Sequence, residues 1–194
     1  MNRRAVILGV VSLAIGMPSL GNAQSARSLL RGWSFVPSIT VLSTKDDPRL
    51  PLVADAIAFW NKTLSGLGTQ FKLGASRQMA GAIPVEEIKM LAANIEPGRP
   101  IRELPESVRR LPGNIVVALS DVDFISFAAR PPPGDKALVA IKDYRAFPLT
   151  LPNVARNVIA HEMGHAIGLP HNADPASQRS EGNSRPLVPN GTTT

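Results

Sequence analysis

The sequence predicts an α/β fold in layers, with a twisted, mostly parallel sheet and amphipathic helices. Three observations lead to this prediction. Apolar residues recur at helical spacing between Val53 and Leu64. The apolar run from Asn114 to Leu119 has the composition of a strand buried on both faces. A second helical pattern extends from Asn153 to Ile167, after the last expected strand.

The first half of the chain alternates strand and helix signals. Ser38 to Ser43 groups β-branched residues between turn residues, which favours a strand. Asp47 followed by Pro48 is a capping acceptor before a residue with fixed φ, so the first helix is predicted to begin there. This helix is expected to lie behind the sheet. A second strand is predicted over Thr69 to Leu73.

The second half begins with a shorter helix, which is predicted to open at Pro84 and to end at Pro97. A long loop follows the buried strand, because the segment Arg130 to Gly134 is too rich in proline for a helix or a sheet. Ala137 to Lys142 is predicted as the next strand.

Composition indicates one ordinary globular domain. The chain has 194 residues, of which 44% are hydrophobic and 19% are charged. It contains no cysteine, which excludes disulfides, thiolate metal sites and cysteine nucleophiles.

The N-terminus has the three parts of a secretory signal. Arg3 and Arg4 precede an apolar run, Ala5 to Ile15, and small residues then lead to Ala23. We expect a signal peptide over residues 1–23 and a secreted or periplasmic protein. A membrane anchor is the alternative, but the apolar run is shorter than the roughly 20 residues that span a bilayer. No stable membrane insertion is therefore expected after cleavage.

Charge does not indicate nucleic-acid binding. Loss of the signal peptide leaves 19 basic and 15 acidic residues, a formal charge of +4. No basic run is interleaved with aromatic residues. The cluster of Arg99, Arg102, Arg109 and Arg110 is interpreted as a solvated face.

The segment His161 to His171 reads HEMGHAIGLPH and has the spacing of a metal site. On a helix, His161 and His165 project from one face about one turn apart. Gly168 then allows the helix to stop in a left-handed turn, after which His171 can supply a third nitrogen. Three imidazoles favour Zn²⁺ and leave a fourth position for water, as in catalytic zinc sites.

Glu162 adds a general base to this site. Its carboxylate is expected to take a proton from the attacking water and to return it to the leaving amine. The alternative is that these histidines are ordinary core or surface residues. Five fixed positions arise by chance in a chain of this length on the order of 10⁻⁵ of the time. All three histidines of the chain also lie in this segment, which favours the metal site.

This motif resembles that of the metzincin zinc peptidases, most closely the matrixin-like branch. The family pattern H-E-x-x-H-x-x-G-x-x-H is matched by His161, Glu162, His165, Gly168 and His171. The segment after the third histidine continues the likeness with Asp174-Pro175. The upstream order of strands and helices is similar to the catalytic domain of that family, so the resemblance covers roughly residues 38–177.

The resemblance implies a zinc endopeptidase with three histidine ligands and Glu162 as general base. It also implies that a polypeptide substrate lies extended along an edge strand above the zinc, here expected at Ala137 to Lys142. We expect a monomeric catalytic domain over residues 24–177.

The chain departs from the family pattern after Ser177. The family has a methionine in a tight turn beneath the metal, whereas this chain has Arg179 at that position and no methionine after Met163. Residues 178–194 read as a flexible polar tail in place of the following helix. Asp121, Asp123 and Asp135 could contribute ligands to a structural Ca²⁺ ion. The interpretation that we favour is that these aspartates are solvated loop residues.

Three functions are thus compatible with the sequence. The leading one is an exported zinc-dependent endopeptidase. The second is a catalytically impaired zinc-binding domain or truncated gene product, which the missing methionine turn favours. The third is a zinc hydrolase that acts on a non-peptide amide, against which the third histidine argues.

Overall fold

The computed structural model describes residues 33–95, 101–132 and 134–170. This part of the chain combines a five-stranded sheet with four helices, so the fold is α/β, as expected. The signal peptide expected at 1–23, the tail expected at 178–194 and His171 lie outside the described residues. The elements are β1 (Ile39–Ser43), α2 (Leu50–Gly66), β2 (Ser76–Ala80), α3 (Val85–Ala93), α4 (Glu106–Arg109), β3 (Ile115–Leu119), β4 (Phe127–Ala129), β5 (Ala137–Ile141) and α5 (Pro152–Ala166).

The sheet is mostly parallel, which confirms the prediction. Its strands lie in the order β2-β1-β3-β5-β4. The three pairs from β2 to β5 are parallel, whereas β4 pairs antiparallel with β5. Strands β1, β3 and β5 also confirm the predicted positions to within one residue at each end.

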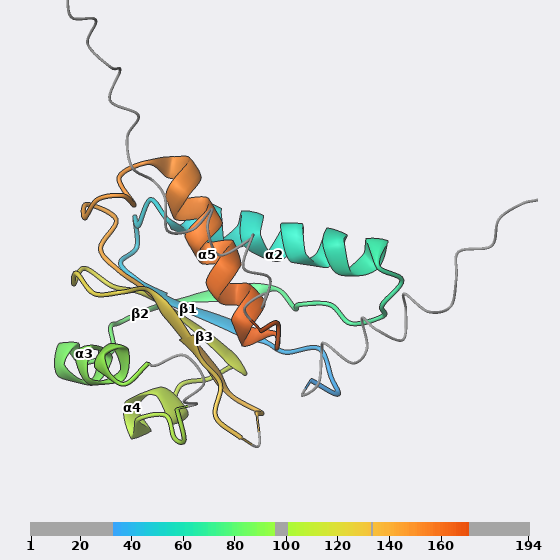
Figure 1. Ribbon diagram of the computed structural model, residues 1–194, viewed down its shortest axis with the longest axis horizontal. Helices are drawn as coiled ribbons and strands as arrows, with labels where there is room; N and C mark the ends of the chain where they lie inside the picture. The colour runs from blue at the N-terminus through green and yellow to red at the C-terminus, as the bar shows by residue number, and fades with distance from the viewer. Residues whose placement is uncertain (1–32, 96–100, 133, 171–194) are drawn as a thin grey trace, which may run out of the picture.

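Helices cover both faces of the sheet (Figure 1). α2 and α5 lie together on one face and enclose a core with alternate residues of β1, β3 and β5. α3 and α4 lie on the opposite face and cover the other alternate set. All five residues of β3 and all five of β5 are therefore buried, as the apolar run in β3 predicted.

The second strand lies later in the chain than the sequence predicted. Thr69 to Leu73 is not a strand, and β2 is formed instead by Ser76–Ala80, which is polar and mostly exposed. Asn61 of α2 takes the place of a strand partner for Leu73. Its side chain accepts the Leu73 N–H at 2.7 Å and donates to the Leu73 carbonyl at 3.1 Å.

The edge of the sheet beside β5 also differs from the prediction. Ala137–Ile141 is a strand, but it lies between β3 and β4 and is therefore not an edge. The edge strand is β4, Phe127–Ala129, in a segment that the sequence predicted as loop. Three residues are too few to show the two-residue periodicity by which a strand is recognised.

The first helix begins later than predicted. α2 starts at Leu50, with Arg49 at its N-cap. Asp47 does not cap the helix, because its carboxylate accepts the Arg49 N–H at 2.9 Å and binds the Arg49 guanidinium. Asp47 thus orders the turn that precedes α2.

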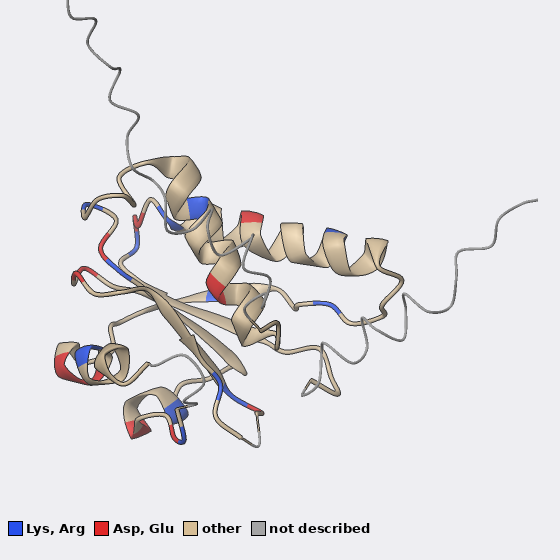
Figure 2. Ribbon diagram, in the orientation of Figure 1, with Lys and Arg blue, Asp and Glu red and all other residues tan. Residues whose placement is uncertain are grey.

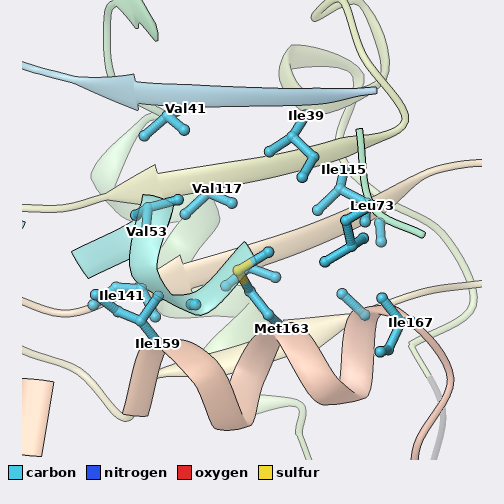
Figure 3. Close-up of a cluster of buried hydrophobic side chains, with 14 of the residues drawn as sticks. Ile39, Val41, Val53, Leu73, Ile115, Val117, Ile141, Ile159, Met163 and Ile167 are labelled. Carbon is cyan, nitrogen blue, oxygen red and sulfur yellow. The ribbon is translucent and has the colours of Figure 1, made fainter. Parts of the chain in front are cut away.

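α5 buries one side against the sheet and leaves another side accessible. Figure 3 shows Ile159, Met163 and Ile167 projecting from this helix toward the side chains of the central strands. All three are fully buried. His161 lies on another side of the helix and is exposed, while His165 is half-buried. The core thus fixes how α5 is rotated and which residues it presents outward.

Charged residues lie mainly on the outer helices and loops (Figure 2). Two members of the basic cluster noted in the sequence, Arg109 and Arg110, form ion pairs with acidic residues. Arg109 forms ion pairs with Glu103 and Glu106, and Arg110 pairs with Glu106 at 2.7 Å. Arg99 lies outside the described residues. Among the described helices, none combines the length and the apolar composition needed to cross a membrane.

Candidate metal centre

The imidazoles of His161 and His165 converge on one point. Their Nε2 atoms lie 3.0 Å apart, and the rings meet edge to face at an interplanar angle of 88°. Two nitrogens bound tetrahedrally to one zinc ion at about 2.0–2.1 Å lie roughly 3.3–3.4 Å apart. A small rotation of either ring reaches that spacing, so the pair fits a shared zinc ion.

A backbone carbonyl fixes the tautomer of His165. Its Nδ1 atom lies 2.7 Å from the carbonyl oxygen of Leu169. Because a carbonyl only accepts, Nδ1 carries the proton and donates it. The lone pair of the neutral ring is then on Nε2, the atom that faces His161. Histidine ligands of metals are oriented by this kind of hydrogen bond.

The turn after α5 has the geometry that the sequence predicted from Gly168. This residue has a φ of 108°, in the region that favours glycine. Its N–H donates to the His165 carbonyl at 2.9 Å, and the Leu169 N–H donates to the Gly164 carbonyl at 3.0 Å. These two bonds form a Schellman motif, which ends the helix and turns the chain back beside His165.

The structure brings together two of the three predicted ligands. His171 lies outside the described residues, as does Arg179, the position of the missing methionine. Within the residues that are described, no group of three or more His, Cys, Asp or Glu side chains is placed to hold a metal ion. The bond between His165 and Leu169 nevertheless keeps the chain beside the imidazole pair two residues before His171.

The side chain of Glu162 extends from α5 toward the edge strand β4. Its side chain is buried, and the N–H of Ala128 in β4 donates a hydrogen bond to its carboxylate. Burial raises the pKa of Glu162 to about 8, and the Ala128 hydrogen bond opposes this shift. A cation bound beside the carboxylate also favours its charged form. The predicted general base is therefore buried near β4, on the residue of α5 that follows His161.

Trp60 of α2 contacts α5 in two ways, and the sequence did not indicate this role. Its indole N–H donates to the carbonyl of Ala160 at 2.7 Å. The same ring covers Gly164, where an added Cβ would lie 2.7 Å from the Trp60 Cζ2 atom. Gly164 is thus required for close approach of the two helices between His161 and His165.

Gly164→Ala is expected to destabilise the protein by about 1–3 kcal/mol, because overpacking outweighs the gain of about 1 kcal/mol in helix propensity. Gly66→Ala is the matched control. Gly66 is the last residue of α2, and an added Cβ would meet nothing within 4 Å, so this change is expected to be neutral or stabilising. Urea unfolding measures both. Equal stability of the two variants would show that Trp60 moves aside freely.

A cavity of about 360 Å³ opens beside His161, between α2 and α5. Phe59, Trp60 and Ala160 give it a mainly apolar wall. Asp55 and Arg156, which form an ion pair at 3.1 Å, lie at its margin. His161 is therefore accessible from this side of the molecule.

The candidates for a calcium site do not converge. Asp121 follows β3 and lies 3.7 Å from the Arg49 guanidinium, and Asp123 binds Lys142 at 2.9 Å. Asp135 precedes β5, which is parallel to β3, so it lies at the opposite end of the sheet. The interpretation as loop residues accounts for these three carboxylates.

Comparisons with protein-family models, with curated proteins and with solved structures gave no significant match. Function is therefore inferred from the centre itself: two converging imidazoles, a buried carboxyl group on the same helix near β4, and close packing of Trp60 on Gly164.

Proposed function

We propose that this protein is an exported zinc-dependent endopeptidase. The observation that carries the proposal is the convergence of the His161 and His165 Nε2 atoms at 3.0 Å, on the helix that also carries the buried Glu162. The resemblance of the HEMGHAIGLPH segment to the metzincin motif supports it. His171 is proposed as the third ligand.

The residues of the site have distinct roles in this chemistry. His161, His165 and His171 hold the ion, and the Leu169 carbonyl orients His165. When bound, zinc supplies a Lewis acid that polarises the scissile carbonyl and activates water. Glu162 takes the proton of the attacking water and returns it to the leaving amine. Its buried position keeps bulk water from competing for that proton.

The edge strand β4 is proposed as the site where the substrate lies. The Ala128 N–H binds Glu162 and therefore points away from β5, the strand with which β4 pairs. The outer edge of β4 thus faces α5. In an antiparallel ladder, the carbonyl of a residue points to the same side as its N–H. The Ala128 carbonyl thus faces outward as well. A peptide paired with β4 would pass directly by Glu162.

The direct test is hydrolysis of unfolded casein by the zinc-loaded chain, with and without a chelator. Proteolysis that the chelator stops and added zinc restores supports the proposal. Zinc binding without any cleavage of casein or unfolded peptides would favour an impaired zinc-binding domain instead.

One zinc ion per chain is expected, and His165→Ala should abolish tight binding, because it removes an imidazole that the Leu169 carbonyl already orients. Zinc content after dialysis measures this. Glu86→Gln is the control, since it removes an exposed carboxylate of α3, on the opposite face of the sheet from α5, and should leave the zinc content unchanged. A full equivalent of zinc in the His165 variant would contradict the ligand assignment.

A further inference from the structure

The two tryptophans of the chain bind the same helix at both ends of its histidine pair. Trp60 donates its indole N–H to the Ala160 carbonyl, immediately before His161. Trp33 donates its indole N–H to the Ala166 carbonyl at 3.0 Å, immediately after His165. Trp33 comes from the segment before β1 and Trp60 from α2, so two separate parts of the fold reach α5.

The bond from Trp33 completes the C-terminal end of α5. The last carbonyls of a helix have no partner inside the helix. Here Ile167, Gly168 and Leu169 donate to the carbonyls of residues 163, 165 and 164, respectively. The remaining carbonyl, that of Ala166, accepts the Trp33 indole N–H. Among the described residues, Trp33 thus occupies a position that backbone donors leave open.

Trp33 is itself held firmly. Its side chain is buried, with 7% of its surface exposed. The Arg130 guanidinium lies over its ring, 4.4 Å from the ring centre, and Arg130 also donates to the Gly134 carbonyl at 3.0 Å. Phe35 packs against the ring edge to face. A cation above an indole and a neighbouring ring both stabilise this placement.

The hydrogen bond from Trp60 differs from that of Trp33, because its acceptor lies inside α5 and not at the end of the helix. Inside a helix, the Ala160 carbonyl also accepts the N–H of Gly164, so the indole is a second donor to that oxygen. The ring covers Gly164 at the same time. Trp60 therefore fixes the turn of α5 that carries both His161 and Glu162, both along the helix axis and in rotation about it.

We propose that Trp33 and Trp60 are positioning residues of the metal centre, which together hold the His161–His165 segment in register with β4. The two bonded carbonyls are six residues, or about 9 Å, apart along the helix. This proposal rests on the proposed function, because it gives the two indoles a role in metal binding. Through Trp33, the segment that precedes β1 becomes part of the support of the metal site.

Trp33→Phe and Trp60→Phe keep an aromatic ring and remove the donor. Each is expected to weaken zinc binding by about 10–100-fold, the usual effect of losing support around metal ligands. Competition with a chromophoric chelator measures the affinity. Each variant should also change the visible spectrum of the Co²⁺-substituted chain, which reports ligand geometry and does not depend on catalysis.

Leu91→Ala is the matched control for a general loss of stability. Leu91 is buried in the core on the opposite face of the sheet, between α3 and the strands. Its loss is expected to lower stability while leaving the zinc affinity within about threefold and the Co²⁺ spectrum unchanged, because α5 keeps its indole bonds. For equal losses of stability, hydrogen exchange at the Gly164 amide should accelerate more in Trp60→Phe than in Leu91→Ala.

A tryptophan analogue with sulfur in place of the ring N–H separates the hydrogen bond from ring packing. Placed at position 60 in the Trp33→Phe chain, it should weaken zinc binding further although the ring shape is kept. If both tryptophan variants match the parent in affinity and spectrum, the positioning role is wrong. It is equally wrong if Leu91→Ala weakens zinc binding as much as the tryptophan variants do. A parent chain that binds no zinc would refute the proposed function as well, which distinguishes the two failures.

Discussion

Glu162→Gln is expected to lower peptide hydrolysis by about 10²-fold or more while the zinc content stays at one per chain. Glutamine has nearly the same shape as glutamate, and its carbonyl oxygen can still accept the Ala128 N–H. The amide cannot take up a proton from water, so the change removes the base alone. The measurement is kcat/KM on a quenched peptide, with zinc determined in the same sample.

Two further substitutions make this test specific. Glu162→Asp keeps the carboxylate on a side chain that is one methylene shorter. The rate of hydrolysis should therefore fall less than in the glutamine variant. Glu103→Gln removes a surface carboxylate that pairs with Arg109 and should leave the rate unchanged. If Glu162→Gln cuts as fast as the parent, another group carries the proton.

Arg49→Met is expected to destabilise the protein by about 3–5 kcal/mol, because it leaves a buried carboxylate without its partner. Arg49 is 1% exposed and binds both oxygens of Asp47, at 2.9 and 2.7 Å. It also donates to the carbonyls of Ser120 and Lys142, at 2.8 and 2.7 Å. These carbonyls follow β3 and β5, so one side chain ties the ends of two adjacent strands to the start of α2.

The chain offers a matched control in Arg145. It also binds an aspartate two residues earlier, Asp143, at 2.9 Å, but its side chain is 61% exposed. Because exposed ion pairs contribute about 0–1 kcal/mol, Arg145→Met should cost no more than that. Arg49→Lys keeps the charge but loses the bidentate bond to Asp47. Its loss of stability should therefore fall between those of Arg49→Met and Arg145→Met. Urea unfolding compares them, and a loss below about 1 kcal/mol for Arg49→Met would contradict the structural role.

Elements with a strong apolar pattern were predictable from the sequence. β3 and β5 lie under helices on both faces, so their residues are continuously apolar and their positions were found. α5 was found from its helical period. β2 was misplaced because its SRQMA segment is largely exposed and has no apolar alternation. β4 was missed because three residues carry no period, and with it the true edge of the sheet.

The convergence of His161 and His165 was predictable, whereas the contacts that support their helix were not. The spacing of His161 and His165 and the turn at Gly168 follow from local helix geometry, which short motifs encode. The contributions of Ala128, Trp33 and Trp60 depend on contacts between distant parts of the chain. No spacing in the sequence indicates such contacts. The value of Gly164 becomes evident only when the ring that covers it is known.

The indole bonds also bear on the order in which the protein assembles. They join residues that are 133 and 100 positions apart in the chain. Closing such long loops costs entropy before any contact compensates, so distant contacts form late in folding. α5 is moreover the last described element, and it docks on a sheet and a helix that must already exist. The candidate metal centre should therefore form last, and partly folded chains should bind zinc only weakly.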